Sequence, residues 1–261
     1  MGRLRIFGIC LITGFVISAI AAGAASAEAP EYGRCVKSTP KAGGYTSATC
    51  VATDKEDNDG SYEWKPGPGP LNKFTISGGN LRVETVVGKT LICKAETGSG
   101  EYSNTVFNRL TGITLVLSKC EASYKCTTVG KTSGEVELRE LQGEVGWENK
   151  LKKKTALILE PASGSGVLFA KFNCVGLEIE WRAHGRGILV NIKNDKMAAT
   201  ETLKYIAKSG KQKPLKWHVG EVGEEEAFLE ASFNELPFEQ AGFAIETTIK
   251  NEEPLELNAV L

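Results

Sequence analysis

The sequence predicts an all-β protein: an antiparallel β-sandwich or flattened β-barrel of about a dozen strands, with a disulfide-looped N-terminal segment. Three observations predict this fold class. Apolar and polar residues alternate at every second position over most of the chain, glycines separate the alternating runs, and an even number of cysteines follows the leader. Closure into a barrel or sandwich is expected because either arrangement hides the edges of a β-sheet.

The first 27 residues form a predicted signal peptide. Arg3 and Arg5 precede an apolar run from Ile6 to about Ala22, and Ala25-Ser26-Ala27 matches the small-residue pattern of an export cleavage site. A retained membrane anchor is the weaker alternative, because the apolar run is short and contains polar residues. We therefore expect cleavage after about Ala27 and a protein that is secreted or associated with the cell envelope.

The mature chain is long enough for one large β domain, which we place at residues 71–261, after an N-terminal segment at 28–70. Removing the 27-residue leader and its two arginines leaves 234 residues with 29 basic and 32 acidic side chains, a net charge of −3. A surface so close to neutral argues against nucleic acid as a partner. No later apolar run is long enough to span a membrane.

The N-terminal segment is too polar to fold alone. A disulfide between Cys35 and Cys50 would close a loop of about 15 residues and contribute about 3 kcal/mol in the chain-entropy model. The segment ends at a spacer, residues 66–70 (PGPGP), which has almost no amide donors for a helix or a central strand. Three aromatic residues should dock it on the main domain: Tyr32, Tyr62 and Trp64.

Residues 54–60, DKEDNDG, match part of a calcium-binding loop. Asp57, Asp59 and Gly60 fit, but Lys55 takes the first ligand position and Pro66 the twelfth, where a bidentate glutamate belongs. A solvated turn is the favoured interpretation, and no metal site is expected.

Strands are expected in order through the main domain, and the clearest runs from Val175 to Trp181. Apolar residues alternate with acidic or basic residues along this stretch, which indicates that one face of the strand is buried and the other is exposed to solvent. Residues 197–208 are the only stretch with any helical character, although Thr200, Thr202 and Tyr205 favour a strand.

Six cysteines remain in the mature chain and predict up to three disulfides. They are Cys35, Cys50, Cys93, Cys120, Cys126 and Cys174. A zinc site is disfavoured because there is no C-x-x-C and no histidine lies near a cysteine.

Strand parity ranks the possible pairings. Cys93 and Cys174 occupy the same alternate positions as the apolar residues of their strands and should therefore face the core. Cys120 is an odd number of positions away from the apolar residues of 113–117 and should face the other side. We therefore expect Cys93 to pair with Cys174 in the core, Cys120 with Cys126 across a tight turn, and Cys35 with Cys50.

No catalytic residues and no cofactor are predicted. His184 and His218 read as turn residues, no G-x-S-x-G marks a nucleophile, and neither G-K-T run has the upstream glycine of a phosphate loop. Glu178 and Glu180 would lie about 7 Å apart on a strand, within the inverting-glycosidase range, but such a pair is typical of any solvated sheet.

The sequence also offers few candidate ligand-binding residues. Parity places Trp147 and Trp181 in the core, which leaves Trp64 and Trp217 as possible ligand-facing aromatics. The run from Lys152 to Lys154 could bind an acidic polymer, although three lysines at a hairpin tip usually serve solubility.

Several motifs together resemble an uncharacterised family of secreted bacterial proteins of similar length. They are PEYGRC (30–35), YEWKPGPGP (62–70), GEVGWENKLKK (143–153), LPFEQAG (236–242) and NEEPLELNAV (251–260). The resemblance covers nearly the whole mature chain and implies export and a single β-rich unit. It carries no known activity, ligand or catalytic residue.

The sequence therefore favours an exported, non-enzymatic protein of the cell envelope or extracellular space with a binding or structural role. Its partner would be a cell-wall or extracellular polymer, or further copies of itself. Two alternatives stay open: a secreted carbohydrate-active hydrolase that uses a carboxylate pair, and a self-assembling surface protein.

Overall fold

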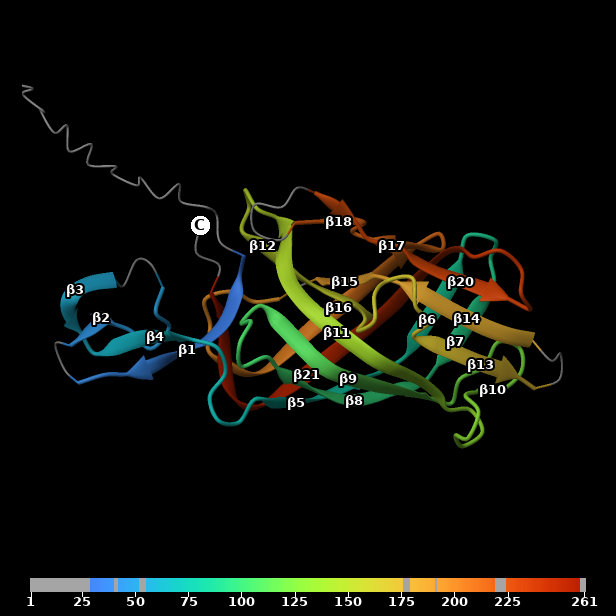
Figure 1. Cartoon of the computed structure of the whole chain (residues 1–261), viewed down its shortest axis with the longest axis horizontal. Helices are drawn as coiled ribbons and strands as arrows, with labels where there is room; N and C mark the ends of the chain where they lie inside the picture. The colour runs from blue at the N-terminus through green and yellow to red at the C-terminus, as the bar shows by residue number, and fades with distance from the viewer. Residues whose placement is uncertain are drawn as a thin grey trace, which may run out of the picture.

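The computed structural model describes residues 29–39, 42–51, 55–175, 179–190, 192–218 and 224–258. All the regular structure in these ranges is β, which confirms the predicted fold class (Figure 1). The strands are β1 (Glu31–Lys37), β2 (Gly43–Tyr45), β3 (Lys55–Gly60), β4 (Tyr62–Pro66), β5 (Lys73–Gly78), β6 (Leu81–Thr85), β7 (Thr90–Cys93), β8 (Ala95–Tyr102), β9 (Arg109–Ser118), β10 (Cys126–Thr127), β11 (Val136–Asn149), β12 (Lys154–Pro161), β13 (Ala170–Cys174), β14 (Ile179–Gly185), β15 (Gly187–Val190), β16 (Ala198–Lys208), β17 (Lys211–Lys213), β18 (Lys216–Trp217), β19 (Glu225–Glu226), β20 (Leu229–Phe233) and β21 (Glu239–Asn258). No helix in the described ranges is long and apolar enough to cross a membrane.

Eight antiparallel strands close into a barrel. The ladder runs from β5 through β8, β9, β11, β12, β15 and β16 to β21, and β21 pairs with β5 again. Of the two closures that the sequence allows, the barrel is the one formed. Its strands alternate as expected: Ile113, Leu115 and Leu117 of β9 are buried while their neighbours point outward.

A second set of strands also closes on itself, and we call it the second ring. Its ladder runs from the first part of β21 through β6 and β7, across Glu121 and Lys125 to β10, and then through β13, β14 and β20 back to β21. The tight turn 120–126 supplies the bridging residues. Figure 1 shows this ring at the end of the molecule that carries β10, β13 and β14.

The N-terminal strands form a third sheet, in the order β1, β4, β2, β3, that projects from the barrel (Figure 1). Glu31–Gly33 of β1 pair with Glu256–Asn258 of β21, and Gly33–Lys37 pair with β4. Tyr32 is 1% exposed, and its ring lies 4.7 Å from that of Tyr102 on β8. Tyr32 therefore docks this sheet as predicted, whereas Tyr62 and Trp64 belong to β4 and pair within the sheet.

Strand β21 holds the three parts together. Over its 20 residues it pairs with β6 and β20 in the second ring, with β5 and β16 in the barrel, and with β1 in the N-terminal sheet. One continuous hydrophobic core accordingly contains side chains from the barrel and the second ring.

The structure corrects two local predictions and decides a third stretch that had mixed signals. Residues 55–60, expected in a solvated turn, form β3 at the edge of the N-terminal sheet. The strand expected over Val175–Trp181 is wrong at its start: β13 ends at Cys174 and Val175 is 68% exposed. Residues 176–178 lie outside the described ranges, and β14 begins at Ile179. The stretch with some helical character forms strand β16, in agreement with the strand preference of Thr200, Thr202 and Tyr205, and it pairs with β15 and β21.

Candidate functional site

The cysteines form three disulfides, of which Cys35–Cys50 was predicted correctly. The other two predicted pairings are wrong. Cys93 bonds to Cys120, not to Cys174, and Cys126 bonds to Cys174, not to Cys120. Disulfides persist in oxidising compartments, so the three bridges indicate an extracytoplasmic environment.

The backbone at Lys119 turns Cys120 to the opposite side from the one that its position in the alternation predicts. Strand β9 ends at Ser118, and Lys119 has a φ of 53°, a left-handed conformation that interrupts the alternation of side chains. Cys120 therefore points into the core and is fully buried. Cys93 and Cys174 do face the core, as predicted, but the turn 120–126 lies between their strands.

The two bridges fix that turn on both sides. Cys93–Cys120 joins it to β7, and Cys126–Cys174 joins it to β13, where Cys126 and Cys174 are direct register partners. Both disulfides therefore lie where the second ring closes, and they fix the turn 120–126 between β7 and β13.

A groove of about 370 Å³ opens at this end of the second ring, and we call it the mouth. It lies between the β6–β7 turn, the turn 120–126, the start of β14 and the end of β20. Its lining residues are Gly88, Lys89, Thr90, Ala122, Ser123, Ile179, Trp181, Phe233, Asn234 and Leu236.

The floor of the mouth is aromatic and rigid. Trp181 stacks on Phe172 with ring centroids 5.7 Å apart and meets Phe233 edge-to-face at 4.2 Å. Trp181 is 4% exposed, so its predicted place in the core is confirmed, and only an edge of the cluster faces the groove.

Exposed apolar side chains lie on or next to the loops that form the mouth, and one of them, Leu236, lines it. They are Val87 on the β6–β7 turn, Tyr124 on the turn 120–126, Val175 after β13 and Leu236 after β20, with exposed fractions between 45% and 68%. Large apolar side chains gathered at one end of a protein commonly mark a binding surface.

The polar groups of the mouth are uncharged or positive. Asn234 is fixed because its amide oxygen accepts the N–H of Glu180 (2.7 Å) and its own N–H donates to the Glu180 carbonyl (3.0 Å). Ser123 and Asn234 both have left-handed backbones, with φ of 67° and 46°, a conformation that costs energy in non-glycine residues. Lys89 and Thr90 complete the polar lining, and no carboxylate is among the described residues that line the groove.

The two aromatic residues predicted to face a ligand lie elsewhere. Trp217 is 3% exposed and packs in a small cluster on the outer surface of the barrel, against Ala156 and Ile158 of β12 and Ile188 of β15. Its expected exposure is therefore wrong, because β18 folds back over the barrel. Trp64 is half-buried, and its ring lies against Gly33 of β1.

Of the two acids that a hydrolase could use, Glu178 and Glu180, the structure describes only Glu180. Glu178 lies outside the described residues, and Glu180 pairs with Lys171 at 3.0 Å on the outer face of the ring. A second pair of acids, Glu160 and Glu225, is joined by Arg186, whose Nε donates to Glu160 (2.6 Å) and whose Nη1 donates to Glu225 (2.8 Å). A single guanidinium therefore bridges both carboxylates and offsets one of their two negative charges.

His184 lies within β14, not in a turn as expected, beside Glu230 (3.6 Å) and near Ser232 on the next strand. The group resembles a Ser–His–acid set, but Ser232 is fully buried. Its hydroxyl donates to the Leu236 carbonyl (2.6 Å) and accepts from Arg182 (3.1 Å). Ser232 therefore supports the loop that carries Leu236, a structural role.

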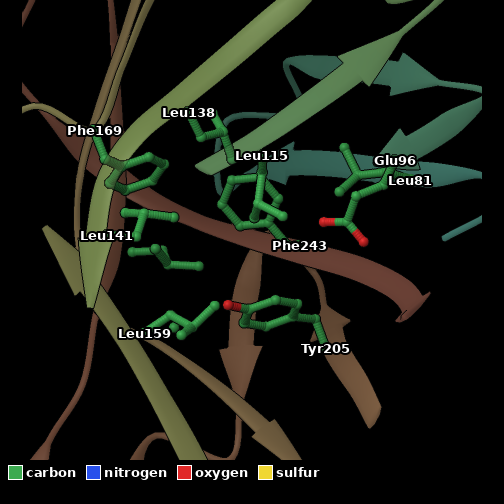
Figure 2. Close-up of a pocket in the computed structure, with 11 residues that line it drawn as sticks. Leu81, Glu96, Leu115, Leu138, Leu141, Leu159, Phe169, Tyr205 and Phe243 are labelled. Atoms are coloured by element: carbon green, nitrogen blue, oxygen red, sulfur yellow. The ribbon is translucent and has the colours of Figure 1, made fainter. Parts of the chain in front are cut away.

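The interior of the barrel is a filled core. Figure 2 shows Glu96 and Tyr205 among leucine and phenylalanine side chains around a cavity of about 30 Å³. Two adjoining cavities are each about 20 Å³, and spaces of this size hold a water molecule at most. Burial raises the pKa of Glu96, against which a hydrogen bond from the Thr247 hydroxyl acts. Burial and the Glu96 carboxylate together raise the pKa of Tyr205.

Sequence reasoning missed the mouth because its residues come from four separate loops. The available signals were apolar side chains within turn sequences, as in TVVGK (85–89) and NELPFE (234–239). No protein-family model, curated protein or solved structure matches this chain, so the motif resemblance to secreted bacterial proteins stays a prediction.

Proposed function

We propose that the protein is an exported, non-enzymatic binding protein of the cell envelope or extracellular space, and that its ligand enters the mouth. The observation that carries the proposal is the mouth itself: a groove of about 370 Å³ in which two disulfides fix the turn 120–126 and whose neighbouring loops carry exposed apolar side chains. This volume lies at the low end of the range of small-molecule sites, which suits a short segment of a larger molecule.

The lining favours a ligand with both an apolar face and hydrogen-bonding groups. Trp181, Phe233 and Leu236 supply apolar contacts, while Lys89, Ser123 and Asn234 supply donors and acceptors. Sugar rings have this dual character, with C–H faces that pack on aromatic groups and hydroxyls that hydrogen-bond at their edges. A cell-wall or extracellular polysaccharide is therefore the proposed ligand class.

The two other functions have less support. A hydrolase needs two carboxylates that converge on a bound sugar, and the acids with described side chains are paired with cations or scattered. Self-assembly by strand addition needs a free edge, and the edge strand β3 has the charged sequence KEDNDG, which disfavours such pairing.

A polysaccharide binding screen with the purified mature protein tests the proposal. The mouth variant Val87→Asp/Leu236→Asp should bind any captured glycan at least about tenfold more weakly, because desolvated acids replace apolar contacts. Leu71→Asp, an exposed leucine on the chain before β5, is the matched control and should bind normally.

Two outcomes would count against the proposal: no glycan bound by the wild type, or equal binding by the mouth variant. Release of new reducing ends during the screen would favour the hydrolase. Concentration-dependent growth in mass by light scattering would favour self-assembly.

A further inference from the structure

We infer that the protein has a second binding site, for a polyanion, at the tip of the β11–β12 hairpin. A groove of about 380 Å³ lies there, and we call it the lysine groove. Its rim includes Lys153, Lys154 and Asn194, and its apolar floor includes Val190, Ile192 and Ile206. It shares no lining residue with the mouth, and Figure 1 shows β12 apart from β13 and β14, on the side of the barrel nearer the N-terminal sheet.

Two segments distant in sequence meet at this groove. The amide nitrogen of Asn194 donates to the Lys153 carbonyl (2.7 Å), and the Thr155 hydroxyl donates to the Asn194 amide oxygen (2.6 Å). Thr155 is buried, and the N–H of Asp195 donates to the Leu257 carbonyl (2.9 Å). The loop around Asn194 is therefore fastened both to the hairpin and to β21.

This fastening brings two sets of lysines together. Lys152, Lys153 and Lys154 come from the hairpin, and Lys193 and Lys196 flank Asn194; all are exposed. Within the part of the chain that the structure describes, no ion pair engages Lys152, Lys153, Lys154 or Lys196. A hairpin tip that needed charge only for solubility would not require lysines from a second, separately anchored loop.

The chemistry of the groove identifies the ligand class. Lys153 and Lys154 line this concave surface, and the other lysines lie on the two adjoining segments. Such ammonium groups favour a chain that presents successive anionic groups, and they concentrate the ligand before contact. Carboxylate and phosphate groups share this chemistry. The acids near the groove are Glu148, which lines it, and Asp195, which is exposed beside Asn194. A flat anionic bilayer is less suited to a recess, although Leu151 at the hairpin tip is 96% exposed.

Binding to soluble polyglutamate and to inorganic polyphosphate at low ionic strength tests this site and distinguishes the two anions. Lys153→Glu/Lys196→Glu should weaken binding about tenfold or more, since each exposed charge pair contributes modestly and two are reversed. Lys94→Glu/Lys250→Glu makes the same change in net charge away from the groove and should stay within about twofold of wild type. Glu148→Gln should bind several times more tightly, a gain that misfolding cannot imitate.

The inference is overturned if neither polyanion binds, or if the control pair weakens binding as much as the groove pair. It is also overturned if vesicles of phosphatidylglycerol bind in place of the polyanions and Leu151→Ser abolishes that binding. The mouth variant Val87→Asp/Leu236→Asp should bind polyanions normally, so this site and the proposed function can fail independently.

Discussion

Removal of the Cys126–Cys174 bridge should destabilise the protein and release the turn 120–126 at the mouth. The bridge closes a loop with a sequence separation of 48 residues, the longest of the three. In the chain-entropy model such a loop contributes about 4 kcal/mol to the free energy of unfolding. Both sulfurs are buried, so alanine is the suitable replacement because it leaves no unpaired hydroxyl in the core.

Urea denaturation of Cys126→Ala/Cys174→Ala should show a free energy of unfolding lower by about 2–4 kcal/mol. The melting temperature should fall by roughly 5–15 °C for a chain of this length. The variant Cys35→Ala/Cys50→Ala is the control: it should lose about 3 kcal/mol but leave glycan binding at the mouth unchanged, because that bridge lies in the N-terminal sheet. A Cys126→Ala/Cys174→Ala variant within about 0.5 kcal/mol of wild type would refute the role given to this bridge.

The disulfide pairing can be determined directly by mapping the tryptic peptides of the non-reduced protein. Trypsin cuts after Lys119 and Lys125, which places Cys120 and Cys126 on separate peptides, CEASYK and CTTVGK. Without reduction, CEASYK should be linked to TLICK, which carries Cys93, and CTTVGK to FNCVGLEIEWR, which carries Cys174. A link between CEASYK and CTTVGK would contradict the structure.

Three further predictions follow from buried groups. Burial, opposed by Lys193, raises the pKa of Glu201 to about 7; the folded state therefore holds a proton that the unfolded state releases near pH 4.5, and stability should fall as the pH rises from about 4.5 to 7. Glu201→Gln should reduce this slope in urea denaturation at pH 5, 6 and 8 without abolishing it, because burial also raises the pKa of Glu256 to about 7. The exposed-site variant Glu252→Gln should keep the full slope. Trp217→Ala should cost about 3–5 kcal/mol in unfolding free energy by emptying the cluster outside the barrel, and an unchanged midpoint would contradict its burial. Gly185→Ala should lower the melting temperature, because the residue has a φ of 106° and its added carbon would overlap the Phe228 carbonyl oxygen; normal stability would refute that packing.

Local pattern was a reliable guide where one strand face is buried and the other is wet. Ile113, Leu115 and Leu117 of β9 are buried as their alternation predicts, and Ile245, Thr247 and Ile249 of β21 likewise face inward. The hydrophobic effect acts on each residue separately, so the pattern is visible without knowledge of the partners.

Predictions from alternation were wrong where a change in backbone conformation interrupts a strand. Lys119 turns Cys120 toward the core, and the strand expected over Val175–Trp181 breaks after Cys174, yet neither event leaves a periodic trace in the sequence. Trp217 was misplaced for a related reason: its burial depends on a segment that folds over the outside of the barrel, not on its own neighbours.

The sequence by itself determined the all-β class, the alternating core faces and the bridge between Cys35 and Cys50, because each follows from short-range periodicity or a short loop. Only the tertiary structure decided the closed barrel, the second ring, the other two disulfides and both grooves. Each of these depends on which strands become neighbours, and that choice is made by long-range pairing such as β21 with β1, β5, β6, β16 and β20. Residues as distant as Ser123 and Asn234 meet at the mouth only because those pairings close the ring.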